Sequence, residues 1–408
     1  MLSGHRVADR AVLDRIRDHP FTRLNRLLAD VPAAAGHEPS ILSIGEPRRT
    51  PPRFIADAMA AHFDDWSRYP LPAGIPELRH ACADWMTTRY RLPAGMIDPD
   101  RHVMAVPGTR EPLYLAIQLI ADRALVPSGP PLALMPDPAY HAYRAATIMA
   151  GAEPVHVPAR PEHGFMPDYA ALSPDILDRA AVAYLCSPCN PQGAAADLDR
   201  WIALVELAQR HNFVLLADEV YSELYAADGR PPAGVAEACA VVNPDMRNVL
   251  IFQSLSKRSN AAGMRSGFVA GDADLVGPFT FLRNYAGTPV PIPLQHAAVA
   301  LWRDEAHVDD NRRFYDANFA LARAVFGNAA GPRPDGGFFL WLDVGDGEAF
   351  AARAWREAAV KVLPGGYMAF GDDPDGSIAR RYARLALVDP PQKLEPALQR
   401  LARLMDRT

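Results

Sequence analysis

The sequence predicts an α/β protein with a mostly parallel sheet in a large domain and a smaller α+β domain after it. Between residues 102 and 271, six short apolar runs alternate with amphipathic helical stretches. This pattern is typical of a parallel sheet covered by helices on both faces. After residue 285 it changes to long helical periodicity and further apolar runs. A chain of 408 residues also exceeds one ordinary core, so two domains are expected.

The expected strands of the large sheet are continuous apolar runs, because both faces of such a sheet are buried. They span residues 102–106, 131–135, 181–185, 213–217, 248–252 and 267–271. Amphipathic helices are expected between them at residues 111–125, 139–152 and 197–212. Ligands of parallel sheets bind beyond the carboxyl ends of the strands, so functional residues should follow these runs directly.

The domain boundaries are expected near a cluster of prolines. We expect a large domain at residues 51–288, a small domain at residues 289–408, and an N-terminal segment at residues 1–50 that packs with the small domain. A closing amphipathic helix is expected from Gln392. The remaining elements of the small domain are a long helical stretch and three short strands, at residues 296–326, 337–344, 361–364 and 382–388.

Composition narrows the class of function. The net charge of −6 argues against a nucleic-acid partner, and no apolar run is long enough to span a bilayer. The four cysteines form no disulfide framework, and the N-terminus lacks a secretory signal, so a cytoplasmic protein is expected. Cys186 and Cys189 form a CxxC that reads as a redox pair, half a zinc site or two small residues at a strand end. The last reading is favoured, and no metal is expected.

Several residues after the strands suit an anionic ligand. Gly108 and Thr109 follow the first run, with Thr109 as an expected N-cap, and a Gly-Thr turn opening a helix can bind an anion. Tyr140 and Tyr143 follow the second run, where they either cover a ligand or belong to the core. Asn190, before a proline, is expected in a fixed turn with its amide aimed inward.

Two ionisable residues lie at the ends of buried runs. Asp218 follows five apolar residues, so its carboxylate needs a cation: a structural arginine or a protonated ligand nitrogen. Lys257 follows another run, and its desolvated amine can act as a nucleophile. Ser254, Ser256 and Arg265 beside it suit a phosphate. Pyridoxal phosphate (PLP) needs a lysine, an acid and a phosphate cradle together.

These residues also form a family motif. The pattern Ser254-x-Ser256-Lys257-x7-Arg265-x-Gly267 resembles the lysine signature of the class I/II aminotransferases of PLP fold type I. The segments "GTRE", "DPAYHAY", "NPQG", "DEVY" and "ARLAL" occur in that family's order. The resemblance covers the whole chain. It implies a seven-stranded sheet, a PLP cofactor and a homodimer.

A closer resemblance concerns the substrate. "LSIGEP", "RPDGGFFLWL" and "DEAHVDDNR" are similar to segments of the proteobacterial N-succinyl-diaminopimelate aminotransferases. This implies transfer of an amino group from glutamate to N-succinyl-2-amino-6-oxopimelate in lysine biosynthesis. Alternatives are transamination of aspartate, alanine, aromatic substrates or LL-diaminopimelate, a β- or γ-lyase, and a non-enzymatic sensor. The sensor is disfavoured because no DNA-binding domain fits before "LSIGEP".

The family resemblance implies catalytic roles. Lys257 would bind the cofactor covalently and carry the proton of the substrate Cα. Asp218 would pair with the pyridinium, while Tyr221 and Asn190 would donate to the phenolic oxygen; Tyr221 as a core aromatic stays open. Tyr140 would stack on the ring. The phosphate would be held by Ser254, Ser256 and Arg265 and by the backbone of Gly108, Thr109 and Arg110, with Ser256 as a mere spacer the alternative.

The resemblance also implies how substrate binds. Arg384 would grip the α-carboxylate as a two-pronged fork, and strand alternation places Arg381 on the opposite face. The backbone at Gly45 would approach the same carboxylate, with Asn190 beside it. Tyr69 would cross a two-fold interface to the partner's phosphate, giving shared active sites.

Overall fold

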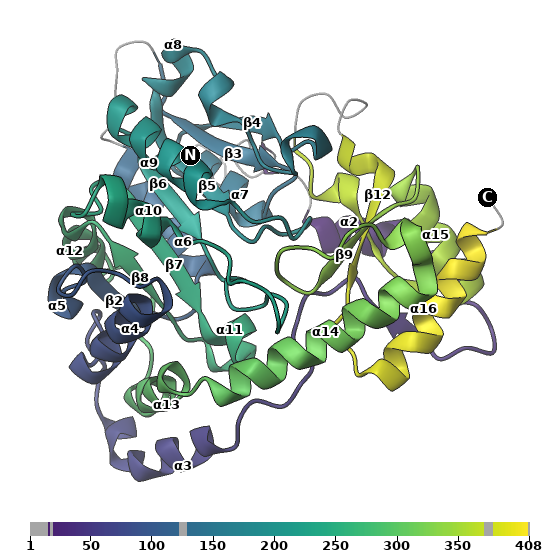
Figure 1. Ribbon diagram of the computed structural model, residues 1–408, viewed down its shortest axis with the longest axis horizontal. Coiled ribbons are helices and arrows are strands. Elements are labelled where there is room, and N and C mark those ends of the chain that lie inside the picture. The colour runs from purple at the N-terminus through teal and green to yellow at the C-terminus, as the bar shows by residue number, and fades with distance from the viewer. Residues whose placement is uncertain (1–14, 17–18, 122–128, 371–377, 407–408) are drawn as a thin grey trace, which may run out of the picture.

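The computed structural model describes residues 15–16, 19–121, 129–370 and 378–406. Figure 1 shows a large unit built on a seven-stranded sheet and a small unit built on a three-stranded sheet. The long helix α14 (Ala306–Phe326) runs from one unit to the other. Among the described residues, no helix has both the length and the apolar character that a membrane span requires.

The large sheet confirms the predicted fold class. Its strand order is β2-β8-β7-β6-β5-β3-β4. Only β8 runs against its two neighbours, and the other pairings are parallel. The strands are β2 (Val103–Val106), β3 (Leu132–Asp137), β4 (Glu153–Pro158), β5 (Ala180–Cys186), β6 (Val214–Asp218), β7 (Val249–Ser254) and β8 (Gly267–Gly271).

No apolar run in the sequence predicted strand β4. It contains Glu153, Pro154 and His156, and its residues are only partly buried. It lies at the edge of the sheet and pairs with β3 alone. An edge strand tolerates proline and polar residues because one side of its backbone stays unpaired.

Helices cover both faces of the large sheet. Helix α9 illustrates why they form: Asp197 accepts the Arg200 N–H at 2.8 Å as an N-cap, and Trp201, Leu204 and Ala208 bury one face. The helices of this unit are α4 (Pro76–Arg89), α5 (Pro99–His102), α6 (Arg110–Ile120), α7 (His141–Met149), α8 (Pro174–Leu177), α9 (Leu198–His211), α10 (Val235–Val242), α11 (Leu255–Arg258) and α12 (Ala273–Leu282).

The small unit combines two short sheets with helices. Strand β12 lies between β11 and β9, both antiparallel to it, and β1 pairs with β10 in parallel. Helix α2 contacts β11, so this part of the N-terminal segment lies with the small unit. The elements are α2 (Pro20–Leu27), β1 (Ser40–Ile41), β9 (Phe339–Asp343), α15 (Gly347–Ala358), β10 (Val360–Lys361), β11 (Leu363–Pro364), β12 (Tyr382–Ala386) and α16 (Pro391–Met405).

The expected long helical stretch at residues 296–326 is divided in two. Helix α13 (Ile292–Arg303) ends at Arg303, and α14 begins at Ala306. Helix α13 packs against α4 and against α3 (Phe54–Ala61), which belong to the large unit. We therefore propose that the boundary between the units falls within α14 rather than at residue 289. Residues 1–14 of the N-terminal segment lie outside the described part.

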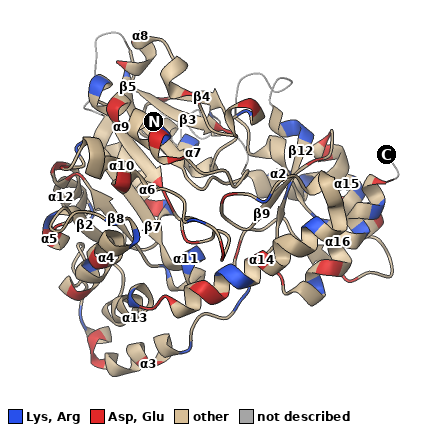
Figure 2. Ribbon diagram, viewed as in Figure 1, with Lys and Arg blue, Asp and Glu red and all other residues tan. Residues whose placement is uncertain are grey.

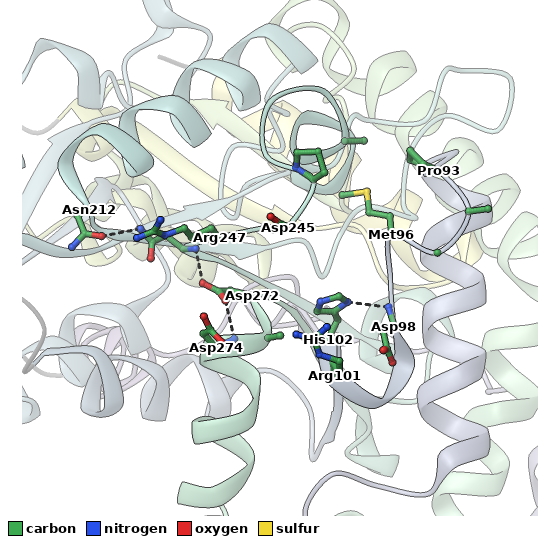
Figure 3. Close-up of a pocket in the computed structure, with 16 residues that line it drawn as sticks. Pro93, Met96, Asp98, Arg101, His102, Asn212, Asp245, Arg247, Asp272 and Asp274 are labelled. Atoms are coloured by element: carbon green, nitrogen blue, oxygen red, sulfur yellow. Dashed lines mark hydrogen bonds between the residues drawn. The ribbon is translucent and has the colours of Figure 1, made fainter.

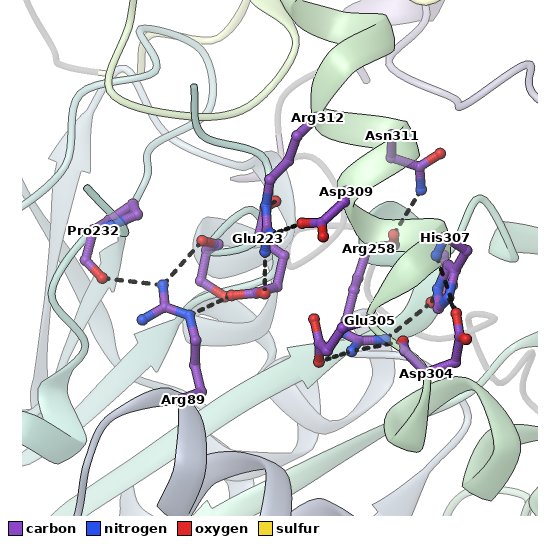
Figure 4. A network of polar contacts seen from close by, with 12 residues as sticks. Arg89, Glu223, Pro232, Arg258, Asp304, Glu305, His307, Asp309, Asn311 and Arg312 are labelled. Atoms are coloured by element: carbon purple, nitrogen blue, oxygen red, sulfur yellow. Dashed lines mark hydrogen bonds and ion pairs between the residues drawn. The ribbon is translucent and has the colours of Figure 1, made fainter. Parts of the chain in front are cut away.

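Ion pairs hold the start of α14 against the large unit. Acidic and basic residues lie side by side there (Figure 2). Figure 4 shows the buried Glu223 carboxylate between two arginines, accepting from Arg89 at 2.6 Å and from Arg312 of α14 at 2.7 Å. Arg258, the neighbour of Lys257, donates to Glu305 at 2.5 Å and to the Leu301 carbonyl at 2.7 Å. The lysine segment and α14 are thus held by one polar network.

We predict that Glu223→Ala strongly destabilises the protein. The substitution leaves Arg89 and Arg312 buried without their carboxylate, which costs about 3–5 kcal/mol. Urea unfolding at fixed pH measures the change. The control is Glu357→Ala, because Glu357 makes an exposed ion pair with Arg353 at 3.8 Å that is worth about 0–1 kcal/mol. Equal effects of the two substitutions would contradict the role of the network.

Candidate active site

The carboxyl ends of the strands bring distant residues to one edge of the sheet. Because β8 runs antiparallel, its first residue, Gly267, pairs with Val106 at the end of β2 and with Ser254 at the end of β7. Asp218 ends β6 and pairs with Phe252 of β7. The segments after β2, β6 and β7 and the segment before β8 therefore meet.

A cavity of about 440 Å³ opens at this edge. Of the predicted site residues, Gly108 and Tyr69 are outside its lining. Gly108 adjoins it through Thr109, whereas the Tyr69 side chain is fully exposed in the single chain. The predicted residues that line the cavity are Gly45, Thr109, Arg110, Tyr140, Asn190, Asp218, Tyr221, Ser254, Ser256, Lys257, Arg265 and Arg384.

Asp218 is a buried carboxylate with one oxygen left over. The Tyr143 hydroxyl donates to its Oδ2 at 2.5 Å, but Oδ1 has no hydrogen-bond partner among the described residues. Burial raises the pKa of Asp218 from 3.8 to about 6, although the bonds from Tyr143 and the Val220 N–H act against this rise. Oδ1 is therefore an acceptor that suits a protonated ligand nitrogen.

Lys257 lies in the short helix α11, directly after β7. Its Nζ donates to the Gly45 carbonyl oxygen at 2.6 Å. Burial and the charges of Arg384 and Arg265 lower the pKa of Lys257 from 10.5 to about 8, and Glu46 opposes them. About a tenth of the amine is then unprotonated at pH 7 and about half at pH 8, far more than for an ordinary lysine, as a nucleophile or general base requires.

Hydroxyls, a guanidinium and a turn converge beside this lysine. Ser254 donates to the Ser256 hydroxyl at 2.9 Å, and Arg265 Nη2 donates to the Pro107 carbonyl at 3.1 Å. Gly108 has φ +77°, and a Cβ there would lie 2.4 Å from Arg265 Nη2, so the turn requires glycine. The donors form a cradle for an anion.

The N-cap prediction for Thr109 is wrong in one respect. Thr109 occupies the N-cap position of α6, but its side chain makes no capping hydrogen bond. Its backbone is already in the helical region, at φ −91° and ψ −17°, whereas a capping side chain needs an extended backbone. The N–H groups of the first turn of α6 therefore remain available to a ligand.

Arg384 lies on β12 with its guanidinium buried. Its Nη1 donates to Asn190 Oδ1 at 2.8 Å and its Nη2 to the Ser43 carbonyl at 2.7 Å, while Nε has no partner in the part of the chain that the structure describes. The guanidinium stacks 4.2 Å from the centre of the Phe339 ring. Burial lowers the pKa of Arg384 to about 10. Arg381, by contrast, pairs with Asp343 on the surface.

Aromatic residues close the remaining walls. Tyr140 accepts a hydrogen bond from Arg110 Nε at 2.6 Å, and burial raises its pKa. Tyr221 is buried against the edges of Phe338 and Phe339, and burial raises its pKa as well. Because Asn190 Oδ1 accepts from Arg384, the Asn190 amide nitrogen is left to donate into the cavity.

Two contacts of the site do not follow from the sequence pattern. The pattern leaves Tyr143 open between covering a ligand and packing in the core; in the structure its hydroxyl holds Asp218. The pattern shows Phe339 only as part of an apolar strand. A Cβ on Gly45 would lie 2.5 Å from the Phe339 ring, so Gly45 is needed for this packing. Neither contact is visible from spacing, since each joins residues far apart in the chain.

A larger hollow, of about 1210 Å³, lies at the opposite edge of the sheet (Figure 3). Its residues precede β2, β6 and β7 or follow β8. One of its acidic groups, Asp272, already binds backbone N–H groups, accepting from Asn248 at 2.8 Å and from Asp274 at 2.9 Å. Ligands of such sheets bind at the carboxyl edge, so the smaller cavity is the candidate site.

The cysteines fit the favoured reading. All four are free and buried, and Cys186 and Cys189 donate to different acceptors, the Pro188 carbonyl and Gln192 Oε1. Burial raises both pKa values, so neither thiol is activated. Away from the cavity, ligand atoms of His62, Asp65 and His296 lie within 4.8 Å of one another. The expectation of no metal stays a prediction.

We predict that Asp218→Asn makes the ligand-free protein more stable at neutral pH. The folded-state pKa, about 6, exceeds the ordinary 3.8. The protonated carboxyl therefore stabilises the fold at low pH, and this contribution is lost as the pH rises through about 6. The loss amounts to about 3 kcal/mol. Urea unfolding from pH 4.5 to 8 should show this decline in the unsubstituted protein and not in the variant. Parallel profiles would refute the assignment.

Comparison with known proteins indicates the same family as the lysine motif in the sequence. The family described as aminotransferase class I and II matches residues 40–401. A solved aminotransferase from Neisseria meningitidis Z2491 is 37% identical, covers 97% of this chain and 100% of its own, and superimposes with a TM-score of 0.91. Aminotransferase AspB from Helicobacter pylori 26695 is 31% identical, covers 96% and 99%, and has a TM-score of 0.87. The LL-diaminopimelate aminotransferase of Desulforudis audaxviator is 31% identical over 407 residues, covering 96% and 97%.

This family uses PLP, and the cavity fits that group. The unpartnered Asp218 Oδ1 suits a protonated ring nitrogen, the donors around Arg265 suit a phosphate, and the Lys257 amine faces the space between them. The chain belongs to the class I and II aminotransferases and is a PLP-dependent aminotransferase with an α/β fold of type I.

Proposed function

We propose that this enzyme transfers an amino group from glutamate to N-succinyl-2-amino-6-oxopimelate, the succinyldiaminopimelate transaminase reaction of lysine biosynthesis. The observation that carries the transfer chemistry is the Lys257 amine, with its lowered pKa, between the bare oxygen of Asp218 and the buried guanidinium of Arg384. A diaminopimelate-type substrate is supported by relatives named LL-diaminopimelate aminotransferase, and its succinylated form by the sequence motifs alone.

PLP supplies an electron sink that stabilises negative charge at the substrate Cα. Asp218 keeps that sink effective by holding the ring nitrogen protonated, and Tyr143 orients the carboxylate. In each half-reaction Lys257 Nζ would move one proton between the substrate Cα and the cofactor, acting as base and as acid in turn. Its pKa of about 8 suits both tasks near neutral pH. Tyr221 and the Asn190 amide donate to the phenolic oxygen.

Charged and polar groups bind the cofactor phosphate and the substrate α-carboxylate. Ser254, Ser256 and Arg265, with the N–H groups of the turn at Gly108, hold the phosphate. Arg384 takes the substrate α-carboxylate, with its Nε as the unpartnered donor, while Asn190 and the Ser43 carbonyl fix the plane of its fork. Both substrates carry an α-carboxylate, so one arginine can serve both half-reactions.

The alternative is direct transamination of LL-diaminopimelate. The names of the relatives favour it: the enzymes of Dehalococcoides mccartyi strain 195 and Desulforudis audaxviator are 28% and 31% identical to this chain. The two reactions differ in the distal end of the substrate, which is a succinylamide with two carboxylates in one case and a free amino acid in the other.

A donor panel tests the proposal. With 2-oxoglutarate as acceptor, glutamate formation is followed with N-succinyl-LL-diaminopimelate, LL-diaminopimelate, aspartate, alanine and phenylalanine. We predict that kcat/KM is at least about tenfold higher for the succinylated donor than for any other. Greater activity with another donor would replace the substrate assignment. Release of ammonia without an acceptor would indicate a lyase instead.

We predict that Arg384→Lys weakens both substrates alike. Lysine keeps the charge but loses the two-pronged geometry, so kcat/KM should fall about tenfold to a hundredfold for glutamate and for the acceptor. The absorbance of bound PLP should be unchanged, because Arg384 does not hold the cofactor. A loss confined to the acceptor would place Arg384 at the distal group instead.

A two-fold dimer with shared active sites belongs to the same proposal. Tyr69 is fully exposed in the single chain, and Phe63, Trp66 and Leu71, which are close to it in the sequence, are exposed as well. A segment that exposes several large apolar side chains suits burial by another copy of the chain. Tyr69 would then reach the phosphate of the partner, and the symmetry makes the exchange reciprocal.

We predict that mixing Tyr69→Ala with Lys257→Ala restores activity. Each hybrid dimer has one intact site, built from the lysine of one chain and the tyrosine of the other, so activity should exceed that of either parent. Differently tagged subunits confirm that hybrids form. Hybrids without recovered activity would reject the shared site.

A further inference from the structure

Two histidines form a hydrogen-bonded pair at one side of the cavity. His19 Nε2 and His141 Nε2 lie 3.0 Å apart, and the rings meet edge to face with centroids 4.3 Å apart. His141 is the first residue of α7 and lines the cavity; His19 directly precedes α2, whose Pro20 and Phe21 line it too. Since α2 contacts β11, the pair joins the small unit to the large one.

The hydrogen-bond network assigns the protons of the pair. The Phe21 N–H donates to His19 Nδ1 at 3.4 Å, so His19 carries its proton on Nε2 and donates it to His141 Nε2. His141 must then carry its proton on Nδ1. No described residue accepts a hydrogen bond from this Nδ1, so His141 has an unused donor at the cavity.

The charges around the pair favour an anion. Burial, with His19, Arg110 and Arg384, lowers the pKa of His141 to about 3, and burial and Arg110 lower that of His19. The resting pair is therefore neutral. Arg110 Nε bonds Tyr140, which leaves its Nη nitrogens without a partner among the described residues. The acidic groups on the cavity wall are Glu46, from the segment before α3, and Asp218.

We propose that His19 and His141 form a subsite for the distal carboxylate of a dicarboxylic substrate. The carboxylate accepts from His141 Nδ1 and, beside it, from Arg110, while Arg384 holds the α-carboxylate. This inference rests on the proposed function only in treating Arg384 as the α-carboxylate site. It extends that function by naming what reads the acidic distal end of the substrate.

The subsite discriminates because the histidine pair is neutral at rest while Arg110 beside it carries a positive charge. A neutral distal group gains little from that charge, whereas a carboxylate gains a charge-assisted hydrogen bond and draws a proton onto the histidine pair. Binding of a dicarboxylate near neutral pH therefore takes up a proton. A monocarboxylate that reaches Arg384 alone does not.

Pairs of straight-chain acids test the proposal on the enzyme with PLP bound. Dissociation constants are measured from the absorbance of bound PLP for mono- and dicarboxylates of equal length, from four to eight carbons. The ratio of the monocarboxylate to the dicarboxylate constant isolates the distal contribution. We expect this ratio to peak at one length, and to fall about tenfold to a hundredfold there in His141→Leu and His19→Leu.

Three further variants separate the subsite from general damage. His141→Asn keeps an N–H donor near the Nδ1 position, so it should retain part of the preference. His37→Leu, at an exposed histidine, is the matched control and should keep the full ratio. Arg384→Lys should weaken mono- and dicarboxylates equally. A ratio unchanged in both histidine variants, or an equal loss for both acids, overturns the subsite.

Calorimetry in two buffers of different ionisation enthalpy gives an independent readout. At pH 6.5 the enzyme should take up protons on binding the preferred dicarboxylate, and the His19→Leu/His141→Leu variant should not. Uptake that persists in the double variant overturns the proposal. Neither measurement uses amino transfer, so a failed donor panel with an intact dicarboxylate preference removes the proposed substrate and leaves the subsite standing.

Discussion

The site depends on a single electrostatic constraint: a carboxylate stands at the end of a fully buried strand in the middle of the sheet. Desolvation makes the charge of Asp218 costly, and the protein supplies only part of the compensation, through Tyr143 and a backbone N–H. One oxygen is left without a partner among the residues that the structure describes. Such a group is unfavourable in the empty protein and favourable once a cation meets it, so the cavity is built to require a cationic ligand atom.

The topology of the sheet decides what surrounds that carboxylate. The reversed strand β8 begins at the carboxyl edge, so Arg265, just before it, lies beside the turn after β2. The network around Glu223 and Arg258 fixes both the lysine segment and the start of α14. Since α14 leads to the strands that carry Arg384 and Phe339, the position of the small unit is tied to the lysine. The residues that act on the cofactor and those that bind the substrate carboxylate are therefore held in fixed positions relative to one another.

The sequence predicted the parts of this arrangement that follow from local pattern. Apolar runs identified the buried strands, and the residues after them identified most of the cavity wall, because strand ends meet at one edge. It missed β4, whose polar and proline residues are permitted only by an edge position, and it read α13 and α14 as one stretch. It also missed the pairing of His19 with His141, since 122 positions separate them. Contacts between units leave no periodic trace in a sequence.

The central claim is that Asp218 Oδ1 holds a protonated ring nitrogen. The most direct measurement is the ¹⁵N chemical shift of the enzyme loaded with PLP labelled at that nitrogen. The account predicts the shift of a protonated pyridine at pH 8, and the shift of a neutral pyridine in Asp218→Asn. A neutral pyridine in the unsubstituted enzyme, or a protonated one in both proteins, would contradict the account.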